Sequence, residues 1–199
     1  MIFSSGVFAQ TAEEILRKAE SSFRNDGGII ADFQLSVENK NKKTEQFDGT
    51  IKMKGSCFYI QTPDIKVWFD GKNQWTLLSN SNEVNLTQPS GAELDTMNPA
   101  VLFNLYKNGY KASKNNGDKL NSPDYYQIKL LPVKNGDVKS ILVLIDKKNY
   151  QIKEIFMALS NSSSNKIQIN KYQTKQSLSD NDFKFSAKQY PDLDIIDLR

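Results

Sequence analysis

The stretch Val67-Trp68-Phe69-Asp70-Gly71-Lys72-Asn73-Gln74-Trp75 has aromatic residues on both sides of a short polar turn. Asp-Gly in this position is a strong β-hairpin signal, because glycine adopts positive φ without steric cost. If the loop is 71–72 or 70–73, Trp68 lies opposite Trp75, and residues paired across a hairpin share one face of a sheet. The stretch therefore predicts an antiparallel sheet with a tryptophan pair on one face. That pair serves either as ordinary core packing or as one wall of an apolar pocket.

Period-two alternation continues on both sides of this hairpin. Apolar and polar residues alternate at 33–37, 47–53 and 126–130, a more continuous apolar run stands at 141–145, and further strands are expected at 58–60, 83–87, 152–156 and 167–172. Clean alternation is typical of antiparallel strands with one dry and one wet face. The spacing of the runs predicts about ten to eleven strands in a sandwich or barrel.

Two segments have helical spacing instead. Residues 11–24 carry an apolar stripe that includes Ile15 and Leu16, and Thr11 is placed to cap the helix. A helical insert is expected near 90–108, where Asn98 caps and Pro99 occupies the first helical position. The predicted class is therefore α+β, mainly antiparallel β, with one helix before the sheet and a helical insert midway.

Composition narrows the function classes. The chain has 199 residues, a net charge of +3, no histidine and one cysteine, Cys57. Such a mild charge gives no reason to expect nucleic-acid binding. Without histidine, the commonest general base and most zinc sites are missing, so we expect no metal, no cofactor and no enzymatic activity. The carboxylates of Asp192 and Asp194 lack a supporting cluster and are better interpreted as a solvated acidic tail.

Residues 1–9 are predicted to be the remnant of a secretory signal, because Val7 and Ala9 suit the −3 and −1 positions of a cleavage site. Residues 10–199 are expected to form a single domain. No apolar run reaches the roughly 18–20 residues that a spanning helix needs. The expected location is the periplasm, as an exported, soluble protein.

Several short motifs occur in an order that resembles a known family. They are Phe47-x-Gly49, the strand at Phe58, Pro63, the Asp70-Gly71-Lys72…Trp75 hairpin, the helix after Pro99, Phe183-Lys184-Phe185, Pro191 and Ile195-Ile196-Asp197. The order is similar to that of the LolA family of periplasmic lipoprotein carriers and the related lipoprotein receptor of the outer membrane. The resemblance covers nearly the whole mature chain.

The resemblance implies a strongly curved, unclosed β-barrel with helices forming a lid over an apolar cavity on the concave face. The side chains expected to line the cavity are Phe33, Leu35, Ile51, Met53, Phe58, Ile60, Val67, Phe69, Trp75, Leu77, Ile128 and Leu130. The lid is expected to contribute Ile15, Leu16, Met97, Leu102, Phe103 and Tyr106. Lys54 stands where the family often has an arginine that latches the lid. Its single ammonium weakens such a latch, and Lys54 is equally an exposed lysine at a strand end.

The implied function is a monomeric carrier that shields the acyl chains of lipoproteins and delivers them to the outer membrane. Its partners would be the acyl chains and, transiently, donor and acceptor proteins at the inner and outer membranes. Three alternatives remain open. The chain could bind another lipid or hydrophobic ligand, it could bind glycans through Trp68 and Trp75, or it could be a structural interaction domain. Glycan binding requires both tryptophans to be exposed beside Asp70, Asn73 and Gln74.

Overall fold

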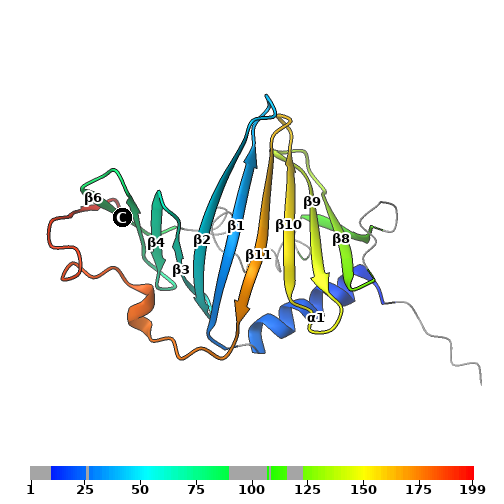
Figure 1. The fold of residues 1–199 in the computed structure, drawn as a ribbon, viewed down its shortest axis with the longest axis horizontal. Coiled ribbons are helices and arrows are strands. Elements are labelled where there is room, and N and C mark those ends of the chain that lie inside the picture. The colour runs from blue at the N-terminus through cyan, green and yellow to red at the C-terminus, as the bar shows by residue number, and fades with distance from the viewer. Residues whose placement is uncertain (1–9, 26, 90–106, 108, 116–122) are drawn as a thin grey trace, which may run out of the picture.

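Figure 1 shows the computed structural model, which describes residues 10–25, 27–89, 107, 109–115 and 123–199. Within these residues, helix α1 (Ala12–Asn25) precedes a single sheet of twelve strands. The strands are β1 (Ile29–Glu38), β2 (Thr44–Lys54), β3 (Cys57–Gln61), β4 (Ile65–Phe69), β5 (Gln74–Leu78), β6 (Glu83–Thr87), β7 (Tyr110–Lys114), β8 (Tyr125–Pro132), β9 (Val138–Asp146), β10 (Ile152–Leu159), β11 (Ser164–Gln173) and β12 (Asp194–Asp197). A short 3₁₀ helix, η2 (Asp180–Phe183), lies between the last two strands.

The sheet has the strand order β12-β6-β5-β4-β3-β2-β1-β11-β10-β9-β8-β7. All neighbours are antiparallel except β12 and β6, which run parallel. Strands β1 and β11 join an N-terminal half to a C-terminal half at the middle of the sheet. The two end strands, β12 and β7, do not pair with each other, so the sheet is not closed.

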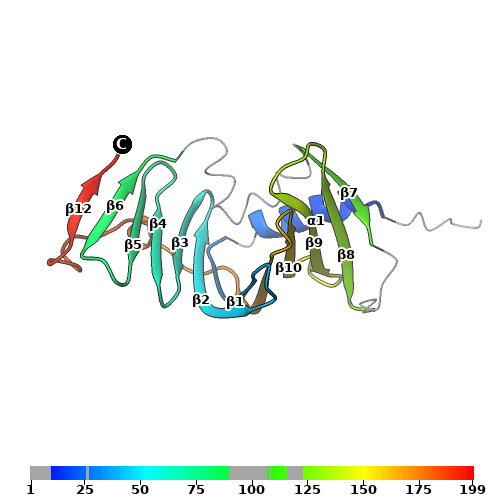
Figure 2. The same cartoon turned by 90° about the horizontal axis from the view of Figure 1, so that it is seen from above.

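The sheet is strongly curved, and α1 lies on its inner side. Figure 2 shows the strands as an arc, with α1 inside the half that contains β8, β9 and β10. The fully buried side chains of Ile15 and Leu16 pack there against a core that includes Ile128, Leu130 and Val143. This half-barrel with an internal helix confirms the predicted fold class.

Helix α1 begins where the sequence predicts, because Thr11 and Glu14 form a reciprocal capping box. The Glu14 amide donates to Thr11 Oγ1 at 3.2 Å, and the Thr11 amide donates to Glu14 Oε2 at 2.9 Å. These two bonds satisfy amides that have no partner inside the helix. The apolar stripe that follows then turns towards the sheet.

The hairpin between β4 and β5 has the predicted register, with Trp68 opposite Trp75. Gly71 has a φ of 96°, and the Asp70 amide donates to the Asn73 carbonyl at 3.1 Å. The Asp70 carboxylate also accepts the Lys72 amide at 3.0 Å and the Asn73 amide at 2.8 Å. The turn residues are thus fixed by the side chain that begins the turn.

Three details differ from the prediction or fall outside the described residues. The sheet has twelve strands, because the prediction omits β7: its sequence, Tyr-Lys-Ala-Ser-Lys, has little apolar alternation and belongs to an edge strand. Phe183-Lys184-Phe185, which the family resemblance places near a closing strand, does not form a strand, since the buried Phe183 ends η2. The expected helical insert near 90–108 lies almost wholly outside the described residues.

We predict that Thr11→Ala lowers the free energy of unfolding by about 1 kcal/mol, because it breaks the capping box. Urea unfolding followed by far-UV circular dichroism measures this change. Glu13→Ala is the matched control in the same turn, since Glu13 is exposed and accepts no hydrogen bond in the described structure. An equal loss in both variants would contradict the capping interpretation.

Candidate functional site

One face of the sheet is apolar along most of its length. Side chains alternate between faces along each strand, so the strand registers assign every residue to a face. Ile51 of β2 pairs with Ala31 of β1 and Ile60 of β3, and Leu35 of β1 pairs with Ile167 of β11. Continuing the pairing from β11 through β10 and β9 to β8 places the side chains that pack under α1 on the same face. We call this inner, concave surface the apolar face.

Two buried clusters occupy different parts of the apolar face. One consists of α1 and the β8–β9 side chains beneath it, and the other combines side chains of β1 to β4, among them Ile29, Met53 and Phe58. Between them, apolar side chains of the central strands are only half-buried: Phe33, Leu35, Val37, Phe47, Met157, Ile167 and Ile169. This strip is less covered than either cluster in the described structure.

Figure 1 shows how the central strands lie relative to α1. Strands β1, β2, β10 and β11 are the tall central strands, and α1 lies across the lower end of the C-terminal half. The upper parts of β1, β2 and β11, which carry Leu35, Val37, Phe47 and Ile167, extend beyond the helix. An apolar surface of this kind binds apolar matter without directional chemistry.

Ten of the twelve side chains expected in the cavity lie on the apolar face. Phe33, Leu35 and Ile60 are half-buried, whereas Ile51, Met53, Phe58, Val67, Phe69, Ile128 and Leu130 are buried. The seven buried side chains therefore belong to the two packed clusters of the apolar face. Ile128 and Leu130 have no exposed surface, because α1 covers them.

Trp75 and Leu77 lie on the opposite face, and their placement in the cavity is corrected here. Trp75 pairs with Trp68, whereas Val67 and Phe69 point to the apolar face. The hairpin pattern shows that Trp68 and Trp75 share a face but does not show which face. On the convex side, Trp68 and Leu77 form a third buried cluster with Val84.

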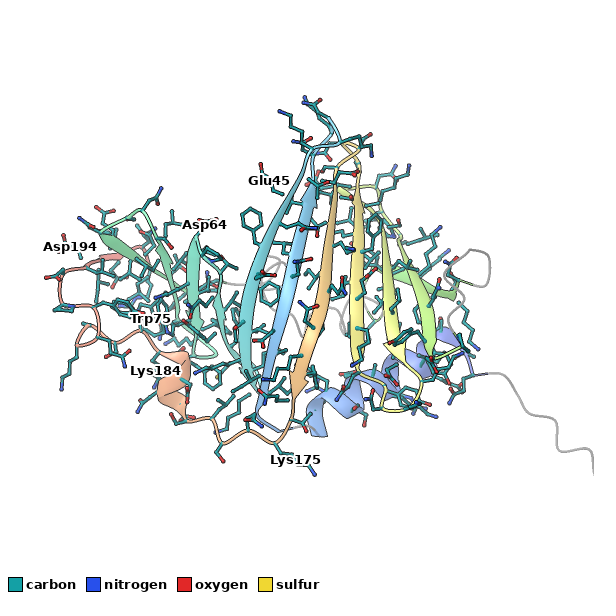
Figure 3. All side chains as sticks on the ribbon, viewed as in Figure 1. Glu45, Asp64, Trp75, Lys175, Lys184 and Asp194 are labelled. Carbon is teal, nitrogen blue, oxygen red and sulfur yellow. The ribbon has the colours of Figure 1, made fainter. Side chains whose placement is uncertain are left out.

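A C-terminal segment covers this third cluster. We call residues 174–193 the strap; it runs from the end of β11 across the outer side of β1 to β6, along the lower edge in Figure 1. The Trp68 ring meets Phe185 edge-on at 5.5 Å between centroids and Tyr190 at 5.8 Å. Figure 3 shows Trp75 and Lys184 on the side of the sheet that contains β4 to β6, at the left of the view.

Three lysines of β2 and β4 hold the strap. Lys52 Nζ lies 2.9 Å from Asp182 Oδ1, Lys54 Nζ donates to the Leu178 carbonyl at 2.8 Å, and Lys66 Nζ donates to the Tyr190 hydroxyl at 3.1 Å. Lys54 thus latches the strap in the described structure. Of the expected lid, Ile15 and Leu16 lie on α1, and Met97, Leu102, Phe103 and Tyr106 lie outside the described residues.

A polar groove of about 970 Å³ opens between the strap and β1 to β4. Its walls include the carboxylates of Asp32, Asp48 and Asp182 together with Lys52 and Lys184. Asp32 accepts a bond from Thr50, and Asp182 is paired with Lys52. An acyl chain that entered a groove lined by paired charges would remove water from those charges, which is costly in free energy. The groove is therefore unsuited to lipid chains, in contrast to the apolar face.

The described residues contain no group of three or more His, Cys, Asp or Glu side chains that could hold a metal ion. Burial raises the pKa of the Cys57 thiol, which disfavours the nucleophilic thiolate. No helix within the described ranges is long and apolar enough to cross a membrane.

The sequence pattern of the family described as "Outer membrane lipoprotein carrier protein LolA" matches residues 5–176. The chain belongs to this family. No curated protein sequence matches the chain significantly.

Among solved structures, an uncharacterized conserved protein from Thermus thermophilus has a TM-score of 0.62 at 12% identity, covering 94% of this chain and 98% of that one. The LolA superfamily protein NE2245 from Nitrosomonas europaea has a TM-score of 0.48 at 11% identity, covering 89% and 99%. At these identities the similarity to the Thermus structure concerns the fold alone. The LolA fold is a binding and carrier fold.

We predict that Asp182→Asn lowers the free energy of unfolding by about 1 kcal/mol at pH 7. The Lys52 ammonium, together with the Ser179 amide, holds the pKa of Asp182 below its ordinary value. A carboxyl whose pKa is lowered by folding stabilises the protein above its unfolded pKa of about 3.9, and this contribution disappears as the pH falls through the folded value. Urea unfolding should therefore show the two proteins converging below about pH 4.

The control for this measurement is Asp192→Asn, which changes an exposed carboxylate that accepts no hydrogen bond among the described residues. Its unfolding free energy should follow that of the wild type at every pH. If Asp182→Asn also followed the wild type, the ion pair with Lys52 would not hold the strap.

Proposed function

We propose that the protein is a non-enzymatic periplasmic carrier that shields the acyl chains of lipoproteins against its apolar face and delivers them to the outer membrane. The observation that carries the proposal is the half-buried apolar strip on β1, β2, β10 and β11, which α1 leaves partly uncovered. The family match over residues 5–176 supports the same function.

The energetics favour acyl chains over smaller apolar ligands. Each CH₂ group taken from water contributes roughly 0.8 kcal/mol, so a long chain needs a long apolar surface. The strip runs across four neighbouring strands, from Phe47 on β2 to Met157 on β10. Met157 adds a flexible thioether side chain, which adapts to ligands without a fixed shape.

A carrier must also release its cargo. Helix α1 already occupies the C-terminal part of the apolar face, where Ile15 and Leu16 fill the curve of the sheet. In this proposal, the acyl chain and α1 compete for neighbouring parts of the apolar face. The net affinity for the acyl chain is lowered, because the cargo can bind only to surface that α1 leaves uncovered or gives up. Transient donor and acceptor proteins at the two membranes would then determine the direction of transfer.

The structure weakens the glycan alternative. A sugar platform needs exposed aromatic faces, but Trp68 is only 7% exposed and Gln74 only 5%. The Asp70 carboxylate already accepts the turn amides of Lys72 and Asn73. The hairpin therefore has the contacts of a packing element, and a different lipid remains the alternative cargo.

We predict that Leu35→Asp and Ile167→Asp each weaken binding of a fluorescent fatty acid by about tenfold or more. Each change removes an apolar contact and places a carboxylate in the strip, which costs on the order of 1.5–3 kcal/mol of binding free energy. Fluorescence titration gives the affinity. Native mass spectrometry of protein purified without detergent from a lipid-containing host tests whether acylated species co-purify.

The matched control is Gln168→Asp, which places the same carboxylate one residue along β11 on the outer face, where Gln168 is exposed. Its affinity should equal that of the wild type. Trp75→Ser should also leave the affinity unchanged, although it lowers stability. Equal loss in Gln168→Asp and Ile167→Asp, or wild-type protein that takes up no acyl chain, would refute the carrier proposal.

A further inference from the structure

Three hairpin loops meet at one end of the sheet, at the top in Figure 1. They are residues 39–43 between β1 and β2, 133–137 between β8 and β9, and 160–163 between β10 and β11. The register pairs Glu38 with Ser164, and the Ser160 amide donates to the Asp137 carbonyl at 2.8 Å. The loops are thus neighbours, and we call them together the hairpin end.

The hairpin end carries an excess of exposed positive charge. Within the loops and the two residues that flank each of them, the exposed lysines are Lys40, Lys42, Lys43, Lys134 and Lys139, and the carboxylates are Glu38, Glu45 and Asp137. Lys42 is paired with Glu38 at 2.7 Å. Lys40, Lys43 and Lys134 have no ion-pair partner within the described part of the chain. Figure 3 shows Glu45 near this end of the sheet and Lys175 at the opposite end.

The β1–β2 tip holds its lysines in a fixed arrangement. Asn39 Oδ1 accepts the amides of Asn41 at 2.9 Å and Lys43 at 3.2 Å, and the Asn39 amide donates to the Lys43 carbonyl at 3.0 Å. These bonds close the loop around its first residue, so the backbone that carries the lysines needs no ordering on binding.

Exposed apolar side chains stand beside this charge. Leu131 is 42% exposed and Val133 is 59% exposed, immediately before Lys134. Apolar side chains flanked by lysines are suited to the interface of a bilayer, where the apolar groups enter the acyl boundary and the ammonium groups meet anionic headgroups. A solvated loop would gain nothing from exposing them.

The apolar strip reaches the same end. Val37 is the last residue before Glu38 on the apolar face, and Leu35 and Phe47 pair just below the tip. An acyl chain leaving a bilayer at the hairpin end would therefore meet the strip without crossing the polar outer face. The upper end of the apolar strip and the basic loops therefore lie at the same end of the sheet.

We propose that the hairpin end is a docking surface for membranes that contain anionic phospholipids, oriented so that acyl chains pass directly between the bilayer and the apolar strip. The inference rests on the proposed carrier function, to which it adds the site and the chemistry of membrane contact. Recognition uses the negative charge of the headgroups and shallow insertion of Leu131 and Val133.

The test is flotation of the full chain with vesicles of phosphatidylcholine containing about 30% phosphatidylglycerol, compared with pure phosphatidylcholine, at low and raised salt. The wild type should bind the anionic vesicles at low salt and the neutral vesicles weakly. The triple variant Lys40→Glu, Lys43→Glu, Lys134→Glu should bind about 100-fold less tightly, since each lysine near such a surface contributes about fivefold.

The control triple is Lys72→Glu, Lys148→Glu, Lys175→Glu, which makes the same change in net charge with exposed lysines at the other end of the strands. It should bind within about threefold of the wild type. The double variant Leu131→Ser, Val133→Ser should weaken vesicle binding at both salt concentrations, because salt does not screen the apolar contribution to binding. Equal loss in the two triples, or no binding by the wild type, would overturn the inference.

Uptake of a fluorescent fatty acid in vesicle-free solution separates this inference from the carrier proposal. All these variants should take up the fatty acid as the wild type does, because none lies on the apolar strip. Normal uptake without vesicle binding would refute the docking surface alone. Vesicle binding without uptake in the wild type would refute the carrier proposal and leave the hairpin end as a membrane-binding surface.

Discussion

The structure depends on one constraint: a single sheet has two faces, and no second sheet covers either of them within the described residues. Alternation makes the inner face apolar, and α1 covers its C-terminal part through Ile15 and Leu16, while Phe23 packs against both inner clusters. The remaining strip on the central strands must face something apolar or stay in contact with water. Within the described residues, this incomplete coverage is the feature on which the proposed carrier function rests, because a fully covered face would leave no room for cargo.

The outer face meets the same constraint differently. Beneath the strap, Trp68 packs against Phe185 and Tyr190, and Lys52 and Lys54 bind Asp182 and Leu178. Elsewhere the outer face is mixed, because Leu142, Leu144 and Phe156 stand half-buried among its polar side chains. The strap crosses from the middle of the sheet to its edge, where β12 adds a parallel strand to β6. It therefore braces the N-terminal half of the curve from its outer side.

The sequence was sufficient for the local elements and much less so for their long-range contacts. The Thr11 cap, the Asp70-Gly71 turn and most of the alternating strands follow from residues close together in the chain, and these are predicted correctly. The assignment of Trp75 to the cavity was wrong because a hairpin pattern shows which residues share a face but not which face a helix covers. The partner of Lys54 is 124 residues away, and no local signal identifies it. The half-buried strip was predicted only in part, through Phe33 and Leu35.

The central claim is that acyl chains lie on the inner face, against the central strands. The most direct test is photocrosslinking with a fatty acid that carries a photoreactive group near the end of its chain, followed by peptide mapping. The account predicts crosslinks to β1, β2 and β11 around Leu35, Phe47 and Ile167. Crosslinks concentrated on the strap or around Trp75, or none above the level of the Ile167→Asp variant, would contradict it.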